Sequence, residues 1–255
     1  MSDVEFSQHG PTAVLTLNRP AKLNTVTAAM AAEIKVLSER CDDDERIRVV
    51  ILTGAGDKAF CAGSDVRDLD TYDSAWTFRN RADYCDSVRA IRKPVICAVN
   101  GHAYGGGLEL CLNSDIRLAS TNATFCAAEI KLGWIGGGGI SFLLTHNIGA
   151  SNAAKMLLTG EPIGSPEALQ HGLVSEVHPP ADLMPAALAL AGVIAERPPI
   201  AAQVAKDNLR AAYAMNLEMA VRYERDLQAV CMGTADAAEG RAAFREKRSP
   251  RFTGR

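Results

Sequence analysis

Short apolar runs that alternate with segments of helical periodicity restrict the fold of this chain more than any other feature. "TAVLTLNRP" (12–20) alternates as a half-buried strand does, and "VVILTG" (49–54) is a continuous apolar run typical of a buried strand. Between them, apolar residues recur every three or four positions, as on one face of a helix: Val26, Met30, Ile34, Leu37 and Cys41. We expect the cap of this helix at Asn24 or Thr25.

The alternation continues along the chain. A polar helical stretch at 74–92 precedes the strand-like "KPVICAVNG" (93–101), and a short helix from Leu108 precedes the strand-like "DIRLAS" (115–120). Strands that alternate with helices predict the α/β class.

The character of the sequence changes near residue 196, after which no strand-like run remains. A chain of 255 residues favours one large core with an appendage. We therefore expect an α/β core over 1–195 that carries the active site, and a helical region over 196–255.

Charge and cysteine usage exclude several classes of protein. The net charge of −3 gives no long-range field to attract nucleic acid, and no apolar run reaches the roughly 20 residues that a membrane span needs. Seven scattered cysteines without a C-x-x-C pair indicate reduced thiols, and the N-terminus has no signal-peptide pattern. We expect a cytoplasmic protein that binds neither nucleic acid nor membrane, and the five histidines show no spacing typical of a metal site.

A glycine run stands directly before a helix in "GHAYGGGLEL" (101–110). Glycines expose the backbone amides, and a helix start leaves N–H groups unpaired, so the segment suits an anion or a developing oxyanion. A close-packed turn without a ligand explains the glycines equally well. A dinucleotide site is disfavoured, because Glu109 follows the glycines at once and would repel a pyrophosphate.

A second glycine-bearing segment, "AFCAGSDVRDL" (59–69), offers the Ser64 amide. A nucleophilic role for Cys61 or Ser64 would require a base, and no histidine stands in a triad motif. Glu109 and Glu129 have the residue type that acid–base chemistry beside a carbonyl needs. From spacing alone, two solvated or salt-bridged glutamates are the favoured interpretation.

Seven motifs together resemble the enoyl-CoA hydratase/isomerase (crotonase) family, from about residue 12 to the end: "LTG", "AFCAGSDV", "KPVICAVNGHAYGGGLEL", "SDIRLAS", "ATFCAAEIKLG", "MLLTGEPIGSPEALQHGLVSEV" and "AAEGRAAFREKRSPRFTGR". The resemblance implies a crotonase-like spiral of ββα units with a helical C-terminal extension. It also implies that residues 196–255 form a trimerisation region and that the protein is a homotrimer or hexamer.

The same resemblance assigns roles to the candidate residues. The amides of Ser64 and Gly106 would form an oxyanion hole for an acyl-CoA thioester. Glu109 would activate a water, Glu129 would supply a proton to C2, and the Gly137 amide would help place the water. The implied function is an enoyl-CoA hydratase of fatty acid metabolism, which adds water syn to a 2-trans-enoyl-CoA and gives 3-hydroxyacyl-CoA. No separate cofactor is expected, because CoA is part of the substrate.

The resemblance also points to substrate-binding positions. Phe244 and Lys247 fall on helices that pack across subunits in this family, so they are expected near a neighbour's site. For Arg67, Lys247 and Arg248, a plain solvated charge is an equally good interpretation. The full set of substrate-binding residues is Lys22, Leu23, Ala62, Gly63, Asp65, Val66, Trp134, Gly137, Phe244 and Lys247.

One segment departs from the family pattern. Gly136 stands where the family usually has proline, Phe142-Leu143 replace Gln-Arg, and Trp134 adds bulk beside the expected acyl site. Glycine widens the conformational range of the loop. The acyl specificity is therefore open, and two alternatives remain: an isomerase or other enolate-forming acyl-CoA lyase, and a non-catalytic acyl-CoA-binding subunit.

Overall fold

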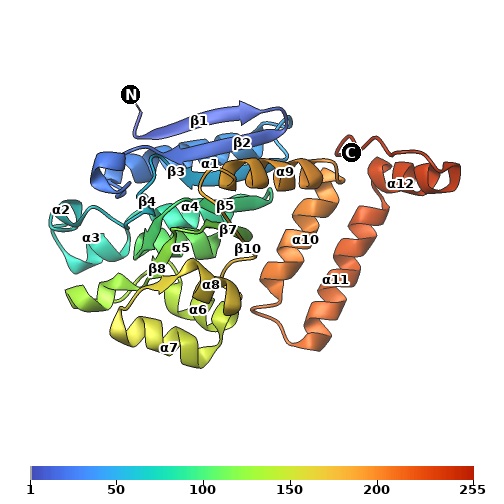
Figure 1. Cartoon of the computed structure of the whole chain (residues 1–255). Helices are drawn as coiled ribbons and strands as arrows, with labels where there is room; N and C mark the ends of the chain where they lie inside the picture. Colours follow the sequence, from blue (N-terminus) through green and yellow to red (C-terminus); the bar gives the residue numbers. More distant parts are fainter. Residues whose placement is uncertain (1) are drawn as a thin grey trace.

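A computed structural model of the chain describes residues 2–255, in which ten strands form two sheets (Figure 1). In the larger sheet the order is β1-β2-β3-β5-β7-β10, and every pairing is parallel except that of β1 with β2. Its strands are β1 Val4–His9, β2 Thr12–Leu17, β3 Val49–Gly54, β5 Val95–Val99, β7 Ile116–Ser120 and β10 Glu176–His178.

The smaller sheet has the order β4-β6-β8-β9 and consists of very short strands. These are β4 Ala59–Cys61, β6 His102–Tyr104, β8 Thr124–Cys126 and β9 Ile163–Gly164. The chain passes from β3 to β4, from β5 to β6 and from β7 to β8, and each time a helical segment follows. The unit strand–strand–helix is thus repeated, which confirms the predicted spiral of ββα units.

A helical segment follows each pair of strands, and the loops between strand and helix lie at one end of the sheets. After β4 come α2 Val66–Leu69, α3 Ala75–Arg79 and α4 Tyr84–Ala90, and after β6 comes α5 Gly106–Asn113. The 3₁₀ helix Ala128–Leu132 follows β8. The remaining helices of the body are α1 Ala28–Asp43, α6 Ile140–Ile148, α7 Ala150–Thr159, α8 Ser165–Gln170 and α9 Leu183–Ala195, and a short 3₁₀ turn spans Pro20–Lys22.

The larger sheet is buried on both faces, as its continuous apolar strands predict. Along β3, Val50 and Leu52 pack into the main core, whereas Val49 and Ile51 point to the opposite face and pack against α9. This alternation follows from the two-residue period of a strand. The sheet therefore forms a rigid base from which the loops beyond its strands project.

Two expectations about helix boundaries are wrong. α1 begins at Ala28 and its cap is Thr27, whose side chain accepts from Met30 N. Asn24 is instead fully buried, and its side-chain amide donates to the carbonyl oxygens of Ala55 and Ala59. α5 begins at Gly106 and not at Leu108.

The stretch 74–92 also differs from its prediction, because it forms two helices and not one. α3 ends at Arg79, and α4 begins after Asp83, whose side chain accepts from Cys85 N. A capping aspartate inside the stretch offers the backbone a bond that competes with a continuous helix. The break matters for the site, because it lets the residues between the two helices turn inward.

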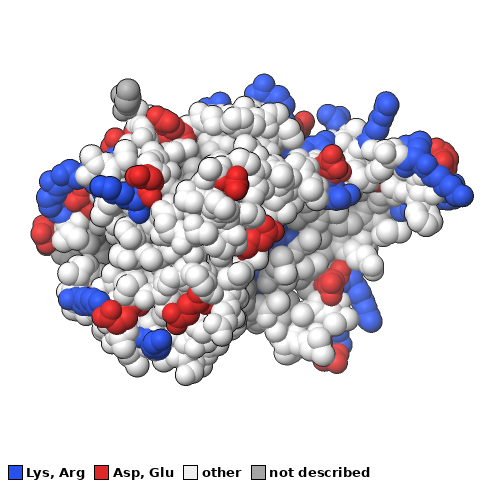
Figure 2. All heavy atoms as spheres, in the orientation of Figure 1, with Lys and Arg blue, Asp and Glu red and all other residues white. Residues whose placement is uncertain are grey.

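Three helices form an arm that extends away from the body (Figure 1): α10 Pro199–Ala211, α11 Leu217–Met232 and α12 Ala235–Glu246. The expected boundary between 195 and 196 falls between α9 and α10. α11 buries none of its side chains. Figure 2 shows the surface hollowed between the body and this arm.

Across residues 2–255, no single helix is long and apolar enough to cross a membrane. α9 and α10 reach the required length and apolar content only when they are taken together, and they meet at a bend of 109°.

Candidate active site

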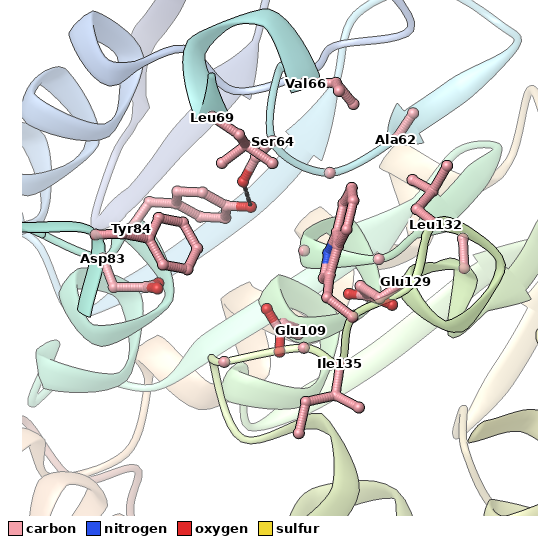
Figure 3. Close-up of a pocket in the computed structure, with 18 of the residues that line it drawn as sticks. Ala62, Ser64, Val66, Leu69, Asp83, Tyr84, Glu109, Glu129, Leu132 and Ile135 are labelled. Atoms are coloured by element: carbon pink, nitrogen blue, oxygen red, sulfur yellow. Dashed lines mark hydrogen bonds between the residues drawn. The ribbon is translucent and has the colours of Figure 1, made fainter. Parts of the chain in front are cut away.

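Residues from segments far apart in the sequence line one cavity of about 430 Å³ (Figure 3). It lies where the segments after β4, β6 and β8 meet the loop before α6. Nine of the predicted site residues line it: Ala62, Gly63, Ser64, Val66, Gly106, Glu109, Glu129, Trp134 and Gly137.

The Ser64 and Gly106 amides come from two loops that lie in contact. A Cβ built on Gly63 would lie 3.2 Å from the Gly106 nitrogen, so the backbones of the two loops approach closely. Gly63 and Gly105 have φ of +95° and +53°, which glycine adopts most easily. Within the described residues neither the Ser64 nor the Gly106 N–H donates a hydrogen bond to the protein. Both amides are thus free to donate to a ligand oxygen.

Glu109 is buried in the first turn of α5, with 5% of its surface exposed. Its Oε1 accepts a 2.7 Å hydrogen bond from Gly138 N. Burial raises the pKa of Glu109 to about 7, the Gly138 bond opposes the rise, and the charge of Glu129 adds to it. This carboxyl can therefore exchange a proton near neutral pH.

Glu129 lies in the first turn of the 3₁₀ helix and is also buried. A Cβ on Gly105 would lie 3.2 Å from its Oε1, so the glycine run passes directly beside this carboxylate. Burial raises the pKa of Glu129. Figure 3 shows Glu109 and Glu129 together in the cavity, which rules out the interpretation of two solvated glutamates.

The loop over 136–139 lies directly on Glu109. A Cβ on Gly136 would overlap Glu109 Oε1, and a Cβ on Gly138 would lie 2.9 Å from Oε2. Asn113 holds the loop from the other side, because its Nδ2 donates to Gly138 O at 2.9 Å. The glycines that depart from the family pattern thus allow a close contact between loop and carboxylate.

Three further predicted residues lie beside the cavity without lining it. Asp65 is buried, caps α2 and pairs with Arg19 and Arg67 at 3.3 and 3.2 Å. Leu23 accepts at its carbonyl oxygen a 3.0 Å hydrogen bond from Ala62 N, and Lys22 is exposed next to it. These contacts attach the 22–23 turn to the loop that carries Ser64.

Phe244 and Lys247 lie at the end of the arm and do not line the cavity of their own chain. Phe244 is 87% exposed. The structure therefore does not bring these two residues together with the other predicted site residues within one chain.

The segment 78–84 supplies a wall of the cavity, and sequence reasoning named none of its residues as site residues. Tyr84, Phe78, Arg81 and Asp83 line the cavity, and Arg81 pairs with Asp83 at 3.0 Å. The guanidinium of Arg81 also lies 4.2 Å from the centre of the Phe78 ring. No spacing in the sequence relates this segment to the glycine run, because the contact arises only when α4 packs against α5.

The geometry of the cavity supports neither a cysteine nucleophile nor a metal site in the described residues. Burial raises the pKa of Cys61 to about 12, so its thiol stays protonated and poorly nucleophilic. Within residues 2–255, no group of three His, Cys, Asp or Glu side chains is placed to hold a metal ion. What the cavity does offer is two free amides and two buried carboxyls, which suit proton transfer beside a polarised carbonyl.

Comparison with known proteins identifies similar chains over nearly the full length. The family model for enoyl-CoA hydratase/isomerase matches residues 8–255. A probable enoyl-CoA hydratase of Mycobacterium bovis is 39% identical over 95% of this chain and 94% of its own length. An (E)-benzylidenesuccinyl-CoA hydratase of Thauera aromatica is 39% identical over 98% of both chains. The crystal structure of an enoyl-CoA hydratase subunit from Geobacillus kaustophilus superposes with a TM-score of 0.94 at 36% identity, covering 100% of this chain and 99% of its own.

Proposed function

Because the chain belongs to the enoyl-CoA hydratase/isomerase family, we propose that it is a hydratase that adds water syn across the double bond of a 2-trans-enoyl-CoA. The product is a 3-hydroxyacyl-CoA. One observation carries the proposal: Glu109 and Glu129 are buried together in the cavity that the Ser64 and Gly106 loops border. A family member that only shifts a double bond needs a single proton-carrying group, whereas water addition uses both carboxyls.

In the proposed reaction the thioester oxygen accepts hydrogen bonds from the amides of Ser64 and Gly106. This polarises the conjugated system, makes C3 electrophilic and stabilises the enolate. A water held by Glu109, Glu129 and the Gly137 amide attacks C3. The electron pair of the C2–C3 double bond then moves onto the thioester oxygen.

The two carboxyls complete the proton balance. Ionised Glu109 takes a proton from the attacking water, and protonated Glu129 gives its proton to C2 as the enolate collapses. A proton transfer from Glu109 to Glu129 restores the site. Since the two groups interact through their charges, the pair titrates together. No electrons are gained or lost, so the reaction requires no added cofactor.

The CoA part of the substrate is proposed to lie along the loop of Ala62, Asp65 and Val66 and the turn of Lys22 and Leu23. The contact between the two segments supports this, because the 22–23 turn borders the loop that leads to Ser64. The acyl group then extends toward Trp134 and the 78–84 segment.

A trimer, or a dimer of trimers, is proposed to form through the arm. The support is α11, whose side chains are not buried, and the exposed Phe244, which has no role within one chain. In such an assembly Phe244 and Lys247 would complete a neighbour's CoA site. A cytoplasmic location belongs to the same proposal and is supported by seven free cysteines, six of them buried.

The test is a panel of CoA thioesters that includes 2-enoyl esters of increasing length, an aryl-substituted ester and a 3-enoyl ester. We expect loss of the enoyl absorbance and formation of the 3-hydroxy product with at least one 2-enoyl-CoA. Glu109→Gln and Glu129→Gln should each lower kcat by at least about 100-fold. Faster turnover of the 3-enoyl ester would instead identify an isomerase, and full activity of Glu129→Gln would exclude the proposed mechanism.

A further inference from the structure

Ser64 and Tyr84 form a hydrogen-bonded pair of hydroxyl groups inside the cavity. The Ser64 Oγ and the Tyr84 Oη are 3.0 Å apart, as the dashed line in Figure 3 marks. Tyr84 is the first residue of α4 and only 8% of its surface is exposed. Its ring is therefore fixed by packing while its hydroxyl reaches the loop that carries the Ser64 amide.

The Tyr84 hydroxyl also touches the second loop of the oxyanion hole. A Cβ on Gly106 would overlap Tyr84 Oη and would lie 3.0 Å from Cζ. The hydroxyl thus occupies the space that a side chain at 106 would fill. It contacts both residues whose free amides face the cavity.

The Ser64–Tyr84 pair has one more hydroxyl proton than its mutual hydrogen bond requires. Two hydroxyl groups carry two protons, and their mutual hydrogen bond uses one. Neither hydroxyl has another partner in the described part of the chain. Whichever group donates to the other, one O–H remains available, and both groups line the cavity. A buried O–H without an acceptor is costly unless a ligand or water receives it.

We propose that Tyr84 is a third hydrogen-bond donor to the thioester oxygen, with Ser64 Oγ–H donating to Tyr84 Oη. The inference rests on the proposed function, because it assigns a role at the same oxyanion. A phenol is the stronger donor of the two groups, and a bond received from Ser64 strengthens the donation further. Tyrosine hydroxyls stabilise enolates in this way in other enzymes. Burial raises the pKa of Tyr84 well above its ordinary value, so the donor keeps its proton throughout the working pH range.

Tyr84→Phe removes the donor and keeps the ring. We expect kcat to fall about 100-fold, as for other oxyanion donors, with little change in KM, because the bond strengthens as charge develops on the oxygen. Tyr104→Phe is the matched control, because it removes a phenol hydroxyl that bonds Thr124 at 3.1 Å outside the cavity lining. A Tyr84→Phe variant no slower than this control would overturn the proposal.

Ser64→Ala separates donation from positioning. This variant keeps the Tyr84 hydroxyl, so we expect a loss about ten times smaller than that of Tyr84→Phe. Equal losses in the two variants would mean that the pair only holds the Ser64 loop in place, and the proposal would be overturned.

Binding of a chromophoric aryl-enoyl-CoA provides a readout that needs no turnover. Polarisation of the thioester carbonyl shifts the absorption of such a ligand to longer wavelength, and we expect a clearly smaller shift in Tyr84→Phe than in wild type or Tyr104→Phe. An unchanged shift would refute the role of Tyr84. A wild-type protein that shifts the ligand but hydrates none of the panel would refute the proposed function and leave the test of Tyr84 intact.

Discussion

The burial of Glu109 affects both the chemistry of the site and the stability of the fold. It is enclosed by the glycine loop and α5, and its pKa of about 7 follows mainly from burial. In the unfolded chain the ordinary value is 4.5. The folded protein therefore binds a proton at this carboxyl more tightly than the unfolded chain does.

Replacement of Glu109 should consequently change how stability depends on pH. The stabilising effect of the raised pKa is complete below about pH 4.5 and is lost as the pH rises toward 7. Between pH 4.5 and 8 the wild type should therefore lose about 3 kcal/mol of unfolding free energy relative to Glu109→Gln. Urea denaturation of both proteins across this range measures the difference, which includes the effect of removing Glu109 on the titration of Glu129. If the unfolding free energies of the two proteins changed with pH in the same way, the assigned pKa of Glu109 would be contradicted.

The sequence identified the individual chemical groups better than their surroundings. Glu109, Glu129 and the two glycine-bearing loops were predicted as neighbours only through the family resemblance, and all of them line the cavity. Tyr84 and Arg81 were not predicted, because their approach depends on the break between α3 and α4 and on the packing of α4 against α5. Spacing along a chain carries no information about contacts of that kind.

At the scale of elements, the 136–139 loop packs directly against the Glu109 carboxylate. Gly136 does not have a positive φ, so alanine suits its backbone, but the added Cβ would meet Glu109 Oε1 and would lie 2.7 Å from Ile140 Cγ2. The loop or the carboxylate must then move.

Gly136→Ala should lower kcat by about 10- to 100-fold, because small displacements of catalytic groups have large effects on rate. Steady-state kinetics with circular dichroism as a check of folding measures this. Gly192→Ala on α9 is the control, since a Cβ there meets nothing within 4 Å and alanine favours the helix. Normal activity of Gly136→Ala would mean that the loop yields without disturbing Glu109.

A buried ion pair on α10 is one of the contacts that attach the arm to the body, beside the hydrogen bond from Arg210 to Ile91 O. Lys206 Nζ lies 2.6 Å from Asp115 Oδ2 and donates to Lys93 O at 2.8 Å, while the Lys206 side chain is 3% exposed. Burial lowers the pKa of Lys206. Removing the lysine leaves a carboxylate without its partner, which is more costly than the pair itself.

Lys206→Met should therefore destabilise the protein by about 3 kcal/mol. Lys155→Met breaks an exposed pair with Glu167, and it should cost less than about 1 kcal/mol. Urea denaturation compares the two variants, and hydrogen exchange should show faster exchange in α10 only for the first. Equal losses would indicate that Lys206 does not hold the arm.

Periodicity and apolar runs predicted α1 and the strands β2, β3, β5 and β7, but neither β1 nor the smaller sheet. β3 and β5 have six and five residues and contain continuous apolar runs, which suffices for a recognisable pattern. β4, β6, β8 and β9 have two or three residues each, too few to show a period. The cap of α1 was misplaced because Asn24 is used to join two loops and not to begin a helix.

At the scale of the whole molecule, the arm exposes apolar side chains that one chain leaves uncovered. Leu217, Met219, Val230, Met232 and Phe244 are each more than half exposed. Figure 2 shows charged residues gathered on the outer part of the arm, whereas the surface toward the body is largely uncharged. These exposed apolar side chains support the proposed assembly through the arm. With a net charge of −3, little repulsion opposes the meeting of identical chains.

A charge placed on this surface should therefore disrupt both assembly and catalysis. Wild type should sediment at three or six times the 27.1 kDa of one chain. Phe244→Asp should sediment as smaller species and show a raised KM for the CoA ester, with a smaller effect on kcat, because Phe244 does not line the cavity that holds the two carboxyls of its own chain. Val36→Asp on α1 introduces the same charge at an apolar residue that is 62% exposed, and it should leave assembly and KM unchanged. If Phe244→Asp dissociated the assembly without raising KM, the arm would serve association alone, and each cavity would be complete within its own chain.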